Sequence, residues 1–589
     1  MHCVLAVSQS VTGRAWTARL DADAERTATA LAQRFQLPEL VARVLAGRGV
    51  TIENAAAEIE PTIRELLPDP STLTDCDTLV AFLADAVEAQ RRVAIFSDYD
   101  VDGATSAAVV VRTLRAFGLQ PSVTIPDRVT EGYGPSVAAM DALADAGADV
   151  VLMLDCGAAA HEPVAHAKAR GMKVLVIDHH PVDRVAEADA VVNPNRADDL
   201  SGLGDCAAVG VAFVAMVGLL REMRRRGVDP GLNLLDCLDC VALGTVADVV
   251  PLTALNRAFV SRGLIAFRRR TNAGLAALAE VARIHGPVEA QHLGYVLGPR
   301  INAGGRIGDA GLGTRLLTLD APDECAAIAA TLDQLNTERR AIEQAALTEA
   351  DAMANGTDPV VVVAGDWHPG VVGLVAARLK ERYRRPAFAL ALTEDGLAVG
   401  SGRSIPGVDL GAAVREAAAS GRVVKGGGHA MAAGLTVPAA DVDALTAWLT
   451  ARLGPEVDAA CAAACVSLDG VAALGSLTEA LARELAAQGP WGRGRQKPVV
   501  ALEAVTVERA VPVGSGDSLR VSLRSADGAR GEAMAFRPHQ ALRARLLAAR
   551  SGAVHLAVEV GHGTFRGAPR VELTIVDVAA IAEEARQAA

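Results

Sequence analysis

Aromatic residues are scarce in this sequence. Phe, Trp and Tyr make up 3% of its 589 residues, so any surface that binds nucleobases by stacking must rest on few side chains. An excess of basic charge is also missing, because 57 Lys and Arg face 70 Asp and Glu for a formal net charge of −13. This balance excludes a protein coated with positive charge for bulk nucleic-acid binding. It leaves room for a local basic groove or an acidic metal site.

The sequence also lacks the patterns of a disulfide framework and of a membrane-spanning segment. The nine cysteines are odd in number and irregularly spaced, which is typical of a reducing cytosol. Cys237 and Cys240 lack a second pair with zinc-ribbon spacing, so we expect them to pack inside a helix. The first residues lack the basic start and long apolar stretch of a signal peptide. The longest uncharged run, 206–220, is shorter than the ~18–20 residues that span a bilayer. We therefore expect a cytoplasmic protein with no membrane partner.

Hydrophobic residues are abundant, at 51%, and the length corresponds to several domains at ~150 residues each. Short aliphatic runs at 93–96, 123–125, 150–154 and 173–177 alternate with helical patterns, which predicts a doubly wound parallel sheet. Residues 321–354 predict a long connecting helix, interrupted once. A second α/β pattern begins at 360, and short β segments between 498 and 578 predict a small barrel.

We therefore predict an α/β multidomain protein made of five regions. The predicted regions are an N-terminal helical region at 1–75, a parallel-sheet domain at 76–260, a helical connector at 261–355, a second α/β domain at 356–454 and a β-barrel region at 455–589.

Acidic residues follow the strands of the predicted parallel sheet. Asp98, Asp100 and Asp102 come after the first strand, Asp155 after the third, and Asp178-His179-His180 after the fourth. Ligands of an open parallel sheet bind outside the carboxyl ends of its strands, so these side chains are expected to converge. Asp248 stands alone in an apolar segment, and a buried carboxylate needs a partner or a metal ion.

Carboxylates that gather in this way repel one another unless cations offset their charge. Asp together with His suits Mn²⁺ or Mg²⁺ better than a closed zinc site, which more often uses Cys. Two such ions clamp the attacking and leaving oxygens of a phosphoryl displacement. The pattern predicts phosphoester or phosphoanhydride hydrolysis. Taken singly, each motif also fits a turn, a calcium loop or a structural histidine pair.

The same motifs resemble those of the DHH phosphoesterase superfamily. The resemblance rests on residues 98–103, 155–157, 178–180 and 244–248, in the superfamily's order. Four further segments resemble its branch of bacterial single-strand-specific exonucleases. These segments are Glu131-Gly132-Tyr133-Gly134, 298–306, 367–373 and 426–429, and the last two resemble the DHH-associated domain. The resemblance runs from about residue 60 to the end of the sequence.

The resemblance implies a set of metal ligands for two divalent ions, Mn²⁺ or Mg²⁺. The implied ligands and catalytic residues are Asp100, Asp102, Asp155, His179 and Asp248, with Asp155 and Asp248 bridging the ions and Asp98 as a further candidate ligand. His180 would face the scissile phosphate. Some relatives carry His at the position of Phe96, which cannot ligate, so one ion is expected to use water, Asp98 or an open position there.

A second set of residues is expected to contact DNA or its phosphates. The set consists of Tyr133, Arg300, Asn302, Arg306, His368, Arg403, Gly427, Gly428, His429 and Trp491. Glycines let backbone amides approach a phosphate closely, and guanidinium groups bind phosphate with two hydrogen bonds. The glycine-rich stretch 298–306 is not expected to form a regular helix. For each Arg the alternative is an ordinary surface salt bridge.

The predicted barrel at 455–589 resembles an oligonucleotide-binding fold, which implies that it binds nucleic acid, and cations lie beside aromatic residues in it. Arg493, Arg495 and Lys497 surround Trp491, and Phe536-Arg537 and Phe565-Arg566 repeat the pairing. Such pairs line barrels that bind single strands, although each pair alone is more typical of an ordinary surface or core. The motif at 494–496 departs from the Gly-Asn-Pro that relatives usually carry.

The resemblance further implies a function: a single-stranded-DNA-specific 5′→3′ exonuclease that releases 5′-mononucleotides in recombination and repair. It implies a monomer, with a helicase and a single-strand-binding protein as candidate partners. Two rival functions remain. One is a phosphoesterase of short oligonucleotides, cyclic dinucleotides or pyrophosphate, which would not need the N-terminal and barrel regions. The other is a catalytically silent replication scaffold, which would not need to keep its ligands.

Overall fold

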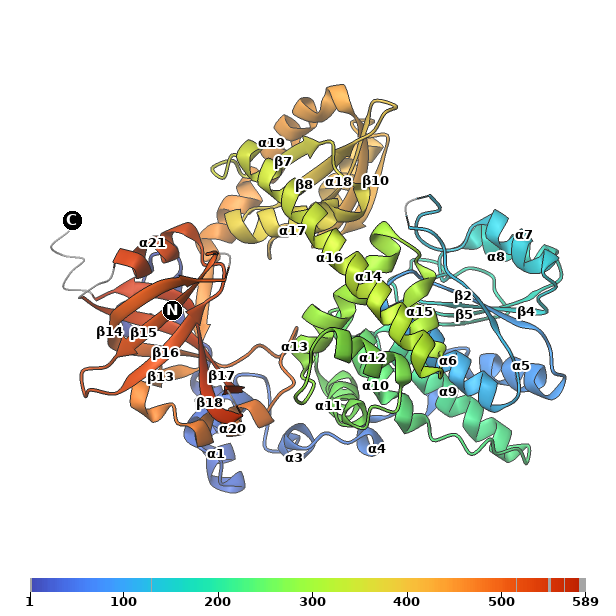
Figure 1. The fold of residues 1–589 in the computed structure, drawn as a ribbon, viewed down its shortest axis with the longest axis horizontal. Coiled ribbons are helices and arrows are strands. Elements are labelled where there is room, and N and C mark those ends of the chain that lie inside the picture. Colours follow the sequence, from blue (N-terminus) through green and yellow to red (C-terminus); the bar gives the residue numbers. More distant parts are fainter. Residues whose placement is uncertain (1–2, 129, 515, 549–551, 566, 582–589) are drawn as a thin grey trace.

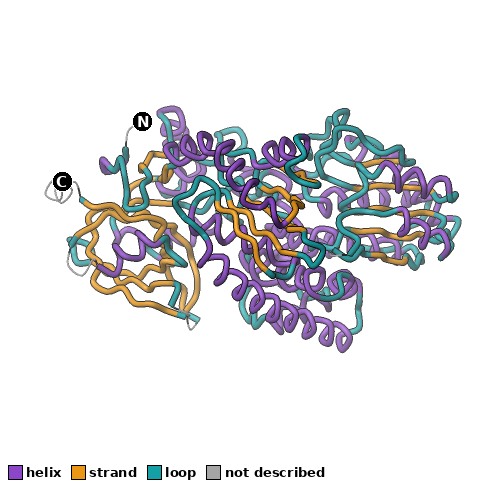
Figure 2. Tube along the Cα trace, turned by 90° about the horizontal axis from the view of Figure 1, so that it is seen from above, coloured by secondary structure: helices purple, strands orange, loops and turns teal. Residues whose placement is uncertain are grey.

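The structure is a computed structural model that describes residues 3–128, 130–514, 516–548, 552–565 and 567–581 (Figure 1). The three larger sheets lie around the long helix α16 (Pro322–Met353): a parallel sheet on the right, a mixed sheet above and a barrel on the left. Seen from above, the barrel and the parallel sheet occupy opposite ends of the molecule (Figure 2). This arrangement confirms the predicted α/β multidomain fold class.

The parallel sheet has the strand order β3-β2-β4-β5-β6, and all neighbours pair in parallel. The domain's elements are α5 (Cys76–Glu88), β2 (Val93–Ser97), α6 (Val101–Ala116), β3 (Ser122–Thr124), α7 (Val137–Asp145), β4 (Val150–Leu154), α8 (His161–Ala169), β5 (Lys173–Ile177), β6 (Ala190–Val192), α9 (Ala208–Arg225), α10 (Leu238–Ala247) and α11 (Ala254–Arg268). From β2 the chain moves outward to β3 and then returns past β2 to β4. The topological switch therefore lies between β2 and β4, where ligands of such sheets bind.

Helices cover both faces of this sheet, which explains why its strands are apolar throughout. Ile95 and Leu152 face the core shared with α5, α6, α9, α10 and α11. Phe96 and Met153 point the other way, into the core shared with α7 and α8. Burying each such side chain contributes about 1.5–3 kcal/mol. Phe96 thus serves the core of the domain, on the face that packs against α7 and α8.

The connector is helical, as predicted, but two of its details correct the prediction. Its elements are α12 (Ala273–Val281), α13 (Ala290–His292), the π-helical turn η4 (Leu293–Leu297), α14 (Gly298–Ile307), α15 (Gly311–Thr318) and α16. Helix α16 runs without the predicted interruption. The glycine-rich stretch forms helix α14, because its glycines serve close packing: a Cβ on Gly304 would lie 2.6 Å from the Asp309 carbonyl oxygen.

The mixed sheet has the order β10-β11-β9-β8-β7. Its elements are β7 (Val361–Gly365), α17 (Pro369–Tyr383), β8 (Ala387–Leu392), β9 (Leu397–Arg403), α18 (Leu410–Ala419), β10 (Lys425–His429), β11 (Ala432–Pro438) and α19 (Val442–Ala463). Helices α18 and α19 pack on one face, and α16 and α17 cover β7 and β8 on the other. On that second face a hollow of about 450 Å³ lies over β9, β10 and β11.

The C-terminal strands close into a five-stranded barrel, as predicted. Strands β14, β15, β16, β18 and β17 pair in that order, and β17 returns to β14. The elements of this region are β12 (Cys465–Leu468), β13 (Gly470–Ala472), α20 (Glu479–Ala487), β14 (Val499–Val513), β15 (Ser518–Arg524), β16 (Arg530–Ala535), α21 (Gln540–Ala548), β17 (Ala553–Phe565) and β18 (Ala568–Ala580).

The N-terminal region is not purely helical, which corrects the prediction for residues 1–75. Its elements are η1 (Val4–Ala6), β1 (Ala15–Ala18), α1 (Ala22–Phe35), α2 (Glu39–Ala46), α3 (Ala55–Ile59) and α4 (Ile63–Leu66). Strand β1 pairs in parallel with β12. Helices α1 and α2 bury Leu31 and Leu45 in the same core as the barrel residues Val500 and Leu556. Most of this region therefore packs as part of the barrel.

Two predicted domain boundaries fall inside helices. The boundary at 260 lies within α11, which packs against α10 in the core of the parallel-sheet domain. The boundary at 455 lies within α19, which continues through Pro455. As predicted, Cys237 and Cys240 are buried beside α10 and within it.

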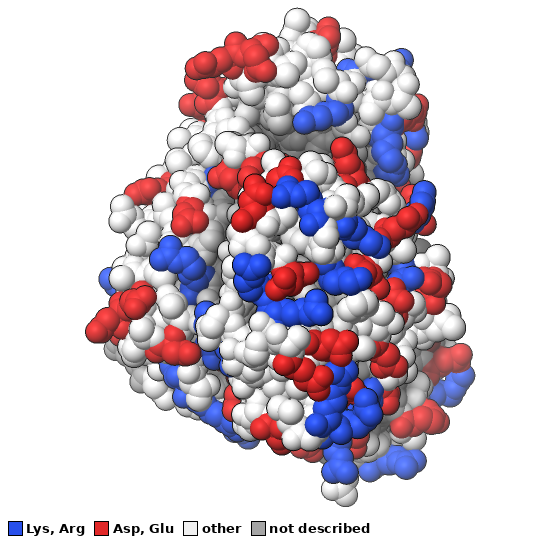
Figure 3. All heavy atoms as spheres, turned by 90° about the vertical axis from the view of Figure 1, so that its right-hand side faces the viewer, with Lys and Arg blue, Asp and Glu red and all other residues white. Residues whose placement is uncertain are grey.

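Among the described residues, no helix is both long enough and apolar enough to cross a membrane. Acidic and basic side chains alternate on the face that the parallel-sheet domain turns outward (Figure 3).

Candidate metal centre

The first acids of the site lie in the tight turn between β2 and α6. Asp100 caps α6, because its Oδ1 accepts the amides of Asp102 (2.8 Å) and Gly103 (3.1 Å). A Cβ on Gly103 would lie 2.3 Å from the Asp98 carbonyl oxygen, so only glycine fits there. The turn thereby places Asp98, Asp100 and Asp102 at the topological switch of the sheet.

Asp102 is oriented by a second helix. Its two carboxylate oxygens accept the amides of Ala208 (2.7 Å) and Val209 (2.9 Å) at the start of α9. The positive end of the helix dipole favours the ionised carboxylate. Each oxygen keeps a lone pair for another partner.

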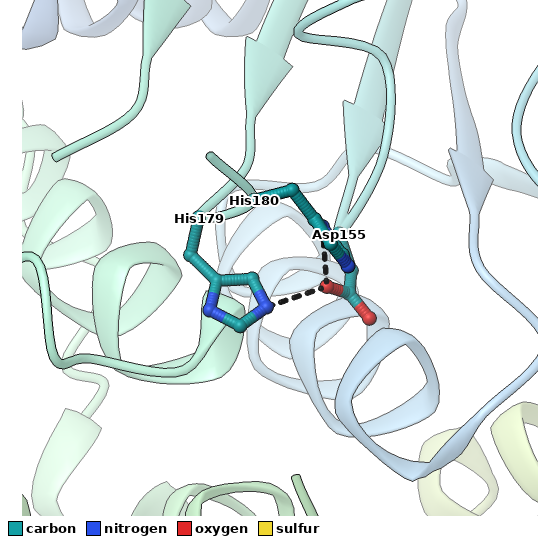
Figure 4. Close-up of side chains that lie close together, drawn as sticks. All are labelled: Asp155, His179 and His180. Carbon is teal, nitrogen blue, oxygen red and sulfur yellow. Dashed lines mark ion pairs between the residues drawn. The ribbon is translucent and has the colours of Figure 1, made fainter. Parts of the chain in front are cut away.

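Asp155 ends β4 with a left-handed backbone, at φ +59°. Such a conformation costs a non-glycine residue about 1–3 kcal/mol and is often found at functional sites. Its Oδ1 lies 3.4 Å from His179 Nε2 and 3.8 Å from His180 Nδ1 (Figure 4). This oxygen is buried without a hydrogen-bond donor.

His179 follows β5 and is held in one orientation. Its Nδ1 lies 3.0 Å from the Cys206 carbonyl oxygen, which can only accept a hydrogen bond, so we assign the proton to Nδ1. Nε2 is then free to ligate, and it lies 3.8 Å from Asp102 Oδ2 and 3.7 Å from Asp248 Oδ2. A histidine ligand is typically oriented through its second nitrogen in this way.

His180 approaches the same Asp155 oxygen as His179 and has its own support. Its Nδ1 lies 2.8 Å from Asp178 Oδ1 and 3.1 Å from the Tyr133 hydroxyl. The Tyr133 hydroxyl in turn donates to the Asp155 carbonyl oxygen at 3.1 Å. Asp178 was not predicted as a supporting residue, although it opens the same Asp-His-His motif.

Burial and mutual repulsion dominate the electrostatics of the acids. Desolvation and the neighbouring Asp100 raise the pKa of Asp98 and of Asp248 to about 7. Desolvation and neighbouring acids raise the pKa of Asp102 and Asp155 well above the ordinary value. Desolvation lowers the pKa of His179 to about 4, so this imidazole is neutral at physiological pH.

The pKa of His180 is raised and that of Asp178 is lowered, the reverse of the shifts of His179 and of the other acids. Burial alone would lower the pKa of His180, but the hydrogen bond to Asp178 raises it above its ordinary value. Burial alone would raise the pKa of Asp178, but hydrogen bonds from His180 and from backbone amides hold it below the ordinary value.

The arrangement fits two divalent cations. Three overlapping groups have ligand atoms within 4.8 Å of one another: Asp98-Asp100-Asp155, Asp102-His179-Asp248 and Asp155-His179-His180. Oδ1 of Asp98 and Oδ1 of Asp155 are buried without donors, and a cation would satisfy both. Carboxylate oxygens with one or two imidazoles favour Mn²⁺ or Mg²⁺. The structure thus brings together all six residues predicted as metal ligands.

Arginines form a second cluster beside the acids, between the two α/β domains. Arg306 of α14 donates to the Gly370 carbonyl oxygen at 2.8 Å. Arg403 of β9 donates to Ser401 Oγ at 2.6 Å. Arg128, which was not predicted, stacks over the Tyr99 ring at 4.8 Å. We call Arg128, Arg306 and Arg403 the arginine cluster.

Carboxylates of the described chain act on the arginine cluster without forming salt bridges with it. The charge of Glu343 partly offsets the fall in the pKa of Arg306, and Arg128 is close enough to lower the pKa of Asp98. Within the described parts of the chain, none of its three members forms a salt bridge. Burial, together with the charges of Arg128, Arg339 and Arg403, lowers the pKa of Arg306 to about 9. Burial and Arg128 likewise lower the pKa of Arg403. A phosphate would relieve this repulsion.

His368 and the start of α17 face the same place. His368 caps α17 by accepting the Gly370 amide at Nδ1, 3.0 Å away, and a helix N-terminus favours anions. Gly427 faces open space, because a Cβ on it would have no atom within 4 Å, and it lies on the floor of the hollow over the mixed sheet. Gly428 has a structural reason to be glycine, because a Cβ there would lie 2.4 Å from the Ala432 carbonyl oxygen. His429 ends β10 and is exposed.

Other predicted DNA contacts lie elsewhere or serve the fold. Arg300 pairs with Asp333 of α16 at 2.8 Å. Asn302 lies on α14, half-buried. Trp491 packs partly against the barrel core, and Arg495 is buried in an ion pair with Glu58 at 2.9 Å. Phe536 is 62% exposed. The predicted Phe565-Arg566 pair lies outside the residues whose side chains are described.

Comparison with known proteins agrees with this geometry. Three family models match the chain: the DHH family N-terminal domain at residues 92–245, the DHHA1 domain at 357–454 and the RecJ OB domain at 468–577. These matches correspond to the parallel-sheet domain, the mixed-sheet domain and the barrel.

Curated relatives and solved structures point to the same family. The chain is 38% identical to the single-stranded-DNA-specific exonuclease RecJ of Dickeya dadantii over 78% of this chain and 83% of the relative. It is 36% identical to that of Escherichia coli over 79% and 83%. The crystal structure of Thermus thermophilus RecJ in complex with Mn²⁺ matches with a TM-score of 0.76 and 27% identity, covering 95% of this chain and 78% of that one. With three domain matches in order and relatives of 36–38% identity over most of their length, the chain belongs to the RecJ family of the DHH phosphoesterases.

Proposed function

We propose that this protein is a metal-dependent exonuclease specific for single-stranded DNA. The observation that carries the proposal is the convergence of five aspartates and two histidines. Two buried carboxylate oxygens of this group have no hydrogen-bond donor, and the adjacent arginine cluster forms no salt bridge with a described residue. Curated relatives with 36–38% identity are named single-stranded-DNA-specific exonucleases, which supports the substrate. We further propose 5′→3′ polarity, release of 5′-mononucleotides and a role in recombination and repair, which rest on the family alone.

The side chains of the site would have different roles in hydrolysis. Asp98, Asp100, Asp102, Asp155, His179 and Asp248 would hold two divalent cations, which supply Lewis-acid activation of water and neutralise phosphate charge when bound. Asp178 keeps His180 oriented and favours its protonated form. A protonated His180 would donate a hydrogen bond to a phosphate oxygen at the cleavage point. Tyr133 keeps His180 and the Asp155 backbone together.

The arginine cluster would bind the strand's phosphates next to the metal centre. Arg306 and Arg403 are half-buried and form no salt bridge with a described residue. A phosphate should therefore gain more from them than from exposed lysines. We propose that His368, Gly427 and His429 extend this path along the mixed sheet. Arg300, Arg495 and Gly428 are assigned to the fold instead, because each has a structural role.

The preference for single strands is proposed to come from a passage of fixed width between the two α/β domains. Gly305 of α14 lies against the Tyr99 carbonyl oxygen, so a Cβ there would be 3.2 Å away. The neighbouring Arg306 bonds to Gly370 of the other domain. One helix thus contacts both sides and sets their separation. Blunt duplex should be cut far more slowly than single strands; equal rates without a partner protein would contradict this proposal.

One experiment separates the proposed function from its rivals. Purified protein is incubated with Mn²⁺ and a 5′-labelled single-stranded oligonucleotide, in parallel with cyclic dinucleotide and pyrophosphate. We expect the long oligonucleotide to be the best substrate, with Asp155→Ala inactive but still bound to DNA. Preferred hydrolysis of a small substrate would favour the oligonucleotide-type phosphoesterase, and binding without cleavage would favour the scaffold.

We also propose that the protein acts in the cytoplasm as a monomer, on strands that a helicase and a single-strand-binding protein supply. An enzyme limited to single strands depends on other proteins to open duplexes. Light scattering after gel filtration tests the monomer, and a stimulation assay with each candidate protein tests the partnership.

A further inference from the structure

The segment 489–495 crosses from the barrel onto the parallel-sheet domain, and we call it the strap. It joins the end of α20 to β14 and lies on the loop that follows α10. The Arg493 carbonyl oxygen accepts the Leu252 amide at 2.8 Å. The Arg493 guanidinium reaches the Val249 carbonyl oxygen at 3.4 Å. Both contacts lie within four residues of Asp248.

The loop that the strap touches is strained. Val249 directly follows Asp248 and has φ +60°, a conformation that is costly for a β-branched residue. Val249 is 58% exposed, so packing of its own side chain cannot hold it there. The hydrogen bonds to Arg493 are the support that the strap adds to this loop.

Buried charges fix the strap to the catalytic domain. Arg495 is 3% exposed and Arg257 of α11 is 1% exposed. Arg495 Nε and Arg257 Nη2 donate to the same acceptor, the Gln488 carbonyl oxygen, at 3.0 and 3.2 Å. Glu58 of α3 pairs with Arg495 at 2.9 Å and with Arg257 at 3.8 Å. The two ends of the strap are therefore joined to each other and fixed to α11 and α3.

A tight turn presents Arg493 to the loop. Gly492 and Arg495 exchange backbone hydrogen bonds at 2.9 and 3.2 Å. Gly494 has φ +73°, and a Cβ on it would lie 3.1 Å from Pro251 Cβ. The turn thus needs glycine both for its backbone angle and for its approach to the loop.

We propose that Arg493 is a positioning residue for the metal ligand Asp248, so that the strap of the barrel domain supports the metal centre. The inference rests on the proposed metal-binding role of Asp248 and extends it. Arg493 fixes the peptide after Asp248 and places a positive charge near that carboxylate. The alternative, a direct contact of Arg493 with DNA, predicts a change in DNA affinity and none in metal affinity.

The test measures metal binding separately from catalysis. Mn²⁺ binding is followed by electron paramagnetic resonance, without DNA, in wild type, Arg493→Ala and Arg493→Lys. We expect Arg493→Ala to bind the weaker of the two ions about tenfold less tightly, within the range seen for residues that orient metal ligands. Arg493→Lys, which keeps a donor and the charge, should recover part of that loss.

Two controls make the outcome decisive. Arg268→Ala removes an equal charge from the exposed end of α11 and should leave Mn²⁺ binding unchanged. Gly494→Val changes the turn without touching any charge and should also weaken Mn²⁺ binding. Wild-type affinity in both Arg493→Ala and Gly494→Val would overturn the inference. If the wild type itself failed to bind Mn²⁺, the proposed function would fall first, so the two failures are distinguishable.

Discussion

The acidic residues of the proposed metal centre form one group of like charge, and the arginine cluster forms another. We call the first group, Asp98, Asp100, Asp102, Asp155 and Asp248, the acid cluster. Both clusters lack enough counter-ions, yet they are built differently. The acids lie on strand ends and helix ends of a single domain. The arginines come from a loop of that domain, from the connector and from the mixed sheet. The proposed metal-binding residues, one half of the site, therefore all belong to one domain, whereas the proposed phosphate-binding residues, the other half, come together only while the domains keep their relative placement.

Removing a central acid tests the first half and should have the largest effect. Asp155→Asn keeps the shape of the side chain but removes the negative charge of the one aspartate that belongs to two of the three ligand groups. We expect exonuclease activity to fall on the order of a thousandfold or more, because the residues of such a site act as a unit. Binding of a single strand in the presence of EDTA, measured by fluorescence anisotropy, should change little. Comparable loss of DNA binding would mean that the two halves are not separate.

Removing a cluster arginine tests the second half. Arg306→Ala and Arg403→Ala should each raise KM for single-stranded DNA about 10- to 100-fold, because a hydrogen bond to a charged group contributes about 1.5–3 kcal/mol. The salt dependence of binding should also weaken, by a slope of about 0.7 for each phosphate that the variant no longer neutralises. Mn²⁺ affinity serves as the control and should stay at the wild-type value.

The acids also predict a pH dependence of stability. Folding raises the pKa of Asp98 and Asp248 to about 7, so between about pH 4 and pH 7 the folded state binds more protons than the unfolded state. The free energy of unfolding of the metal-free protein should then fall as pH rises through this window, by about 1.4 kcal/mol per pH unit for each such proton. His179, with its lowered pKa, opposes this trend below pH 6.5.

Thermal melts in EDTA from pH 5 to pH 8 measure this effect. Stabilisation by Mn²⁺ should grow over the same range, because the carboxylates must lose their protons to ligate. Asp98→Asn is the matched variant and should flatten the pH dependence. A melting temperature that rises steadily with pH in EDTA would contradict the assignment.

The smallest effect is expected where a predicted phosphate contact proved to be a structural pair. Arg300→Ala breaks the ion pair with Asp333 and the bond to the Val296 carbonyl oxygen. We expect a loss of about 1–2 kcal/mol in the free energy of unfolding, measured by urea denaturation. KM for single-stranded DNA should stay within twofold of the wild type, which sets Arg300 apart from Arg306 on the same helix.

Sequence reasoning found the acid cluster because its geometry follows from chain order. Asp100, Asp155 and His179 each follow a strand of one parallel sheet, and the carboxyl ends of such strands share an edge. The arginines could not be sorted in the same way. Arg300 and Arg306 lie in one motif, and only the fold shows that Asp333 of α16 reaches the first and that, among the described residues, no carboxylate pairs with the second.

Elements whose partners lie far away in the sequence could not be predicted from the sequence either. Strand β1 has four residues, too few for a period-two pattern, and its partner β12 lies far along the chain. The sequence around Arg495 predicts a DNA contact because Glu58, which neutralises this arginine, comes from the N-terminal region. The sequence of α14 predicts a loop because glycines ordinarily weaken a helix, whereas here they serve close contacts with Asp309 and Tyr99.

The pairing of β1 with β12 also bears on how the chain is made. The parallel-sheet domain has all of its strands once residue 192 has been synthesised, so it can form while translation continues. Strand β1 is synthesised before the parallel sheet, but it can pair only after its partner β12, in the last quarter of the sequence, has been synthesised. Ribosome-bound fragments that stop before the barrel should therefore leave Trp16, which is fully buried in the complete chain, exposed to solvent. The parallel-sheet domain of the same fragments, with its proposed metal centre, should already be folded.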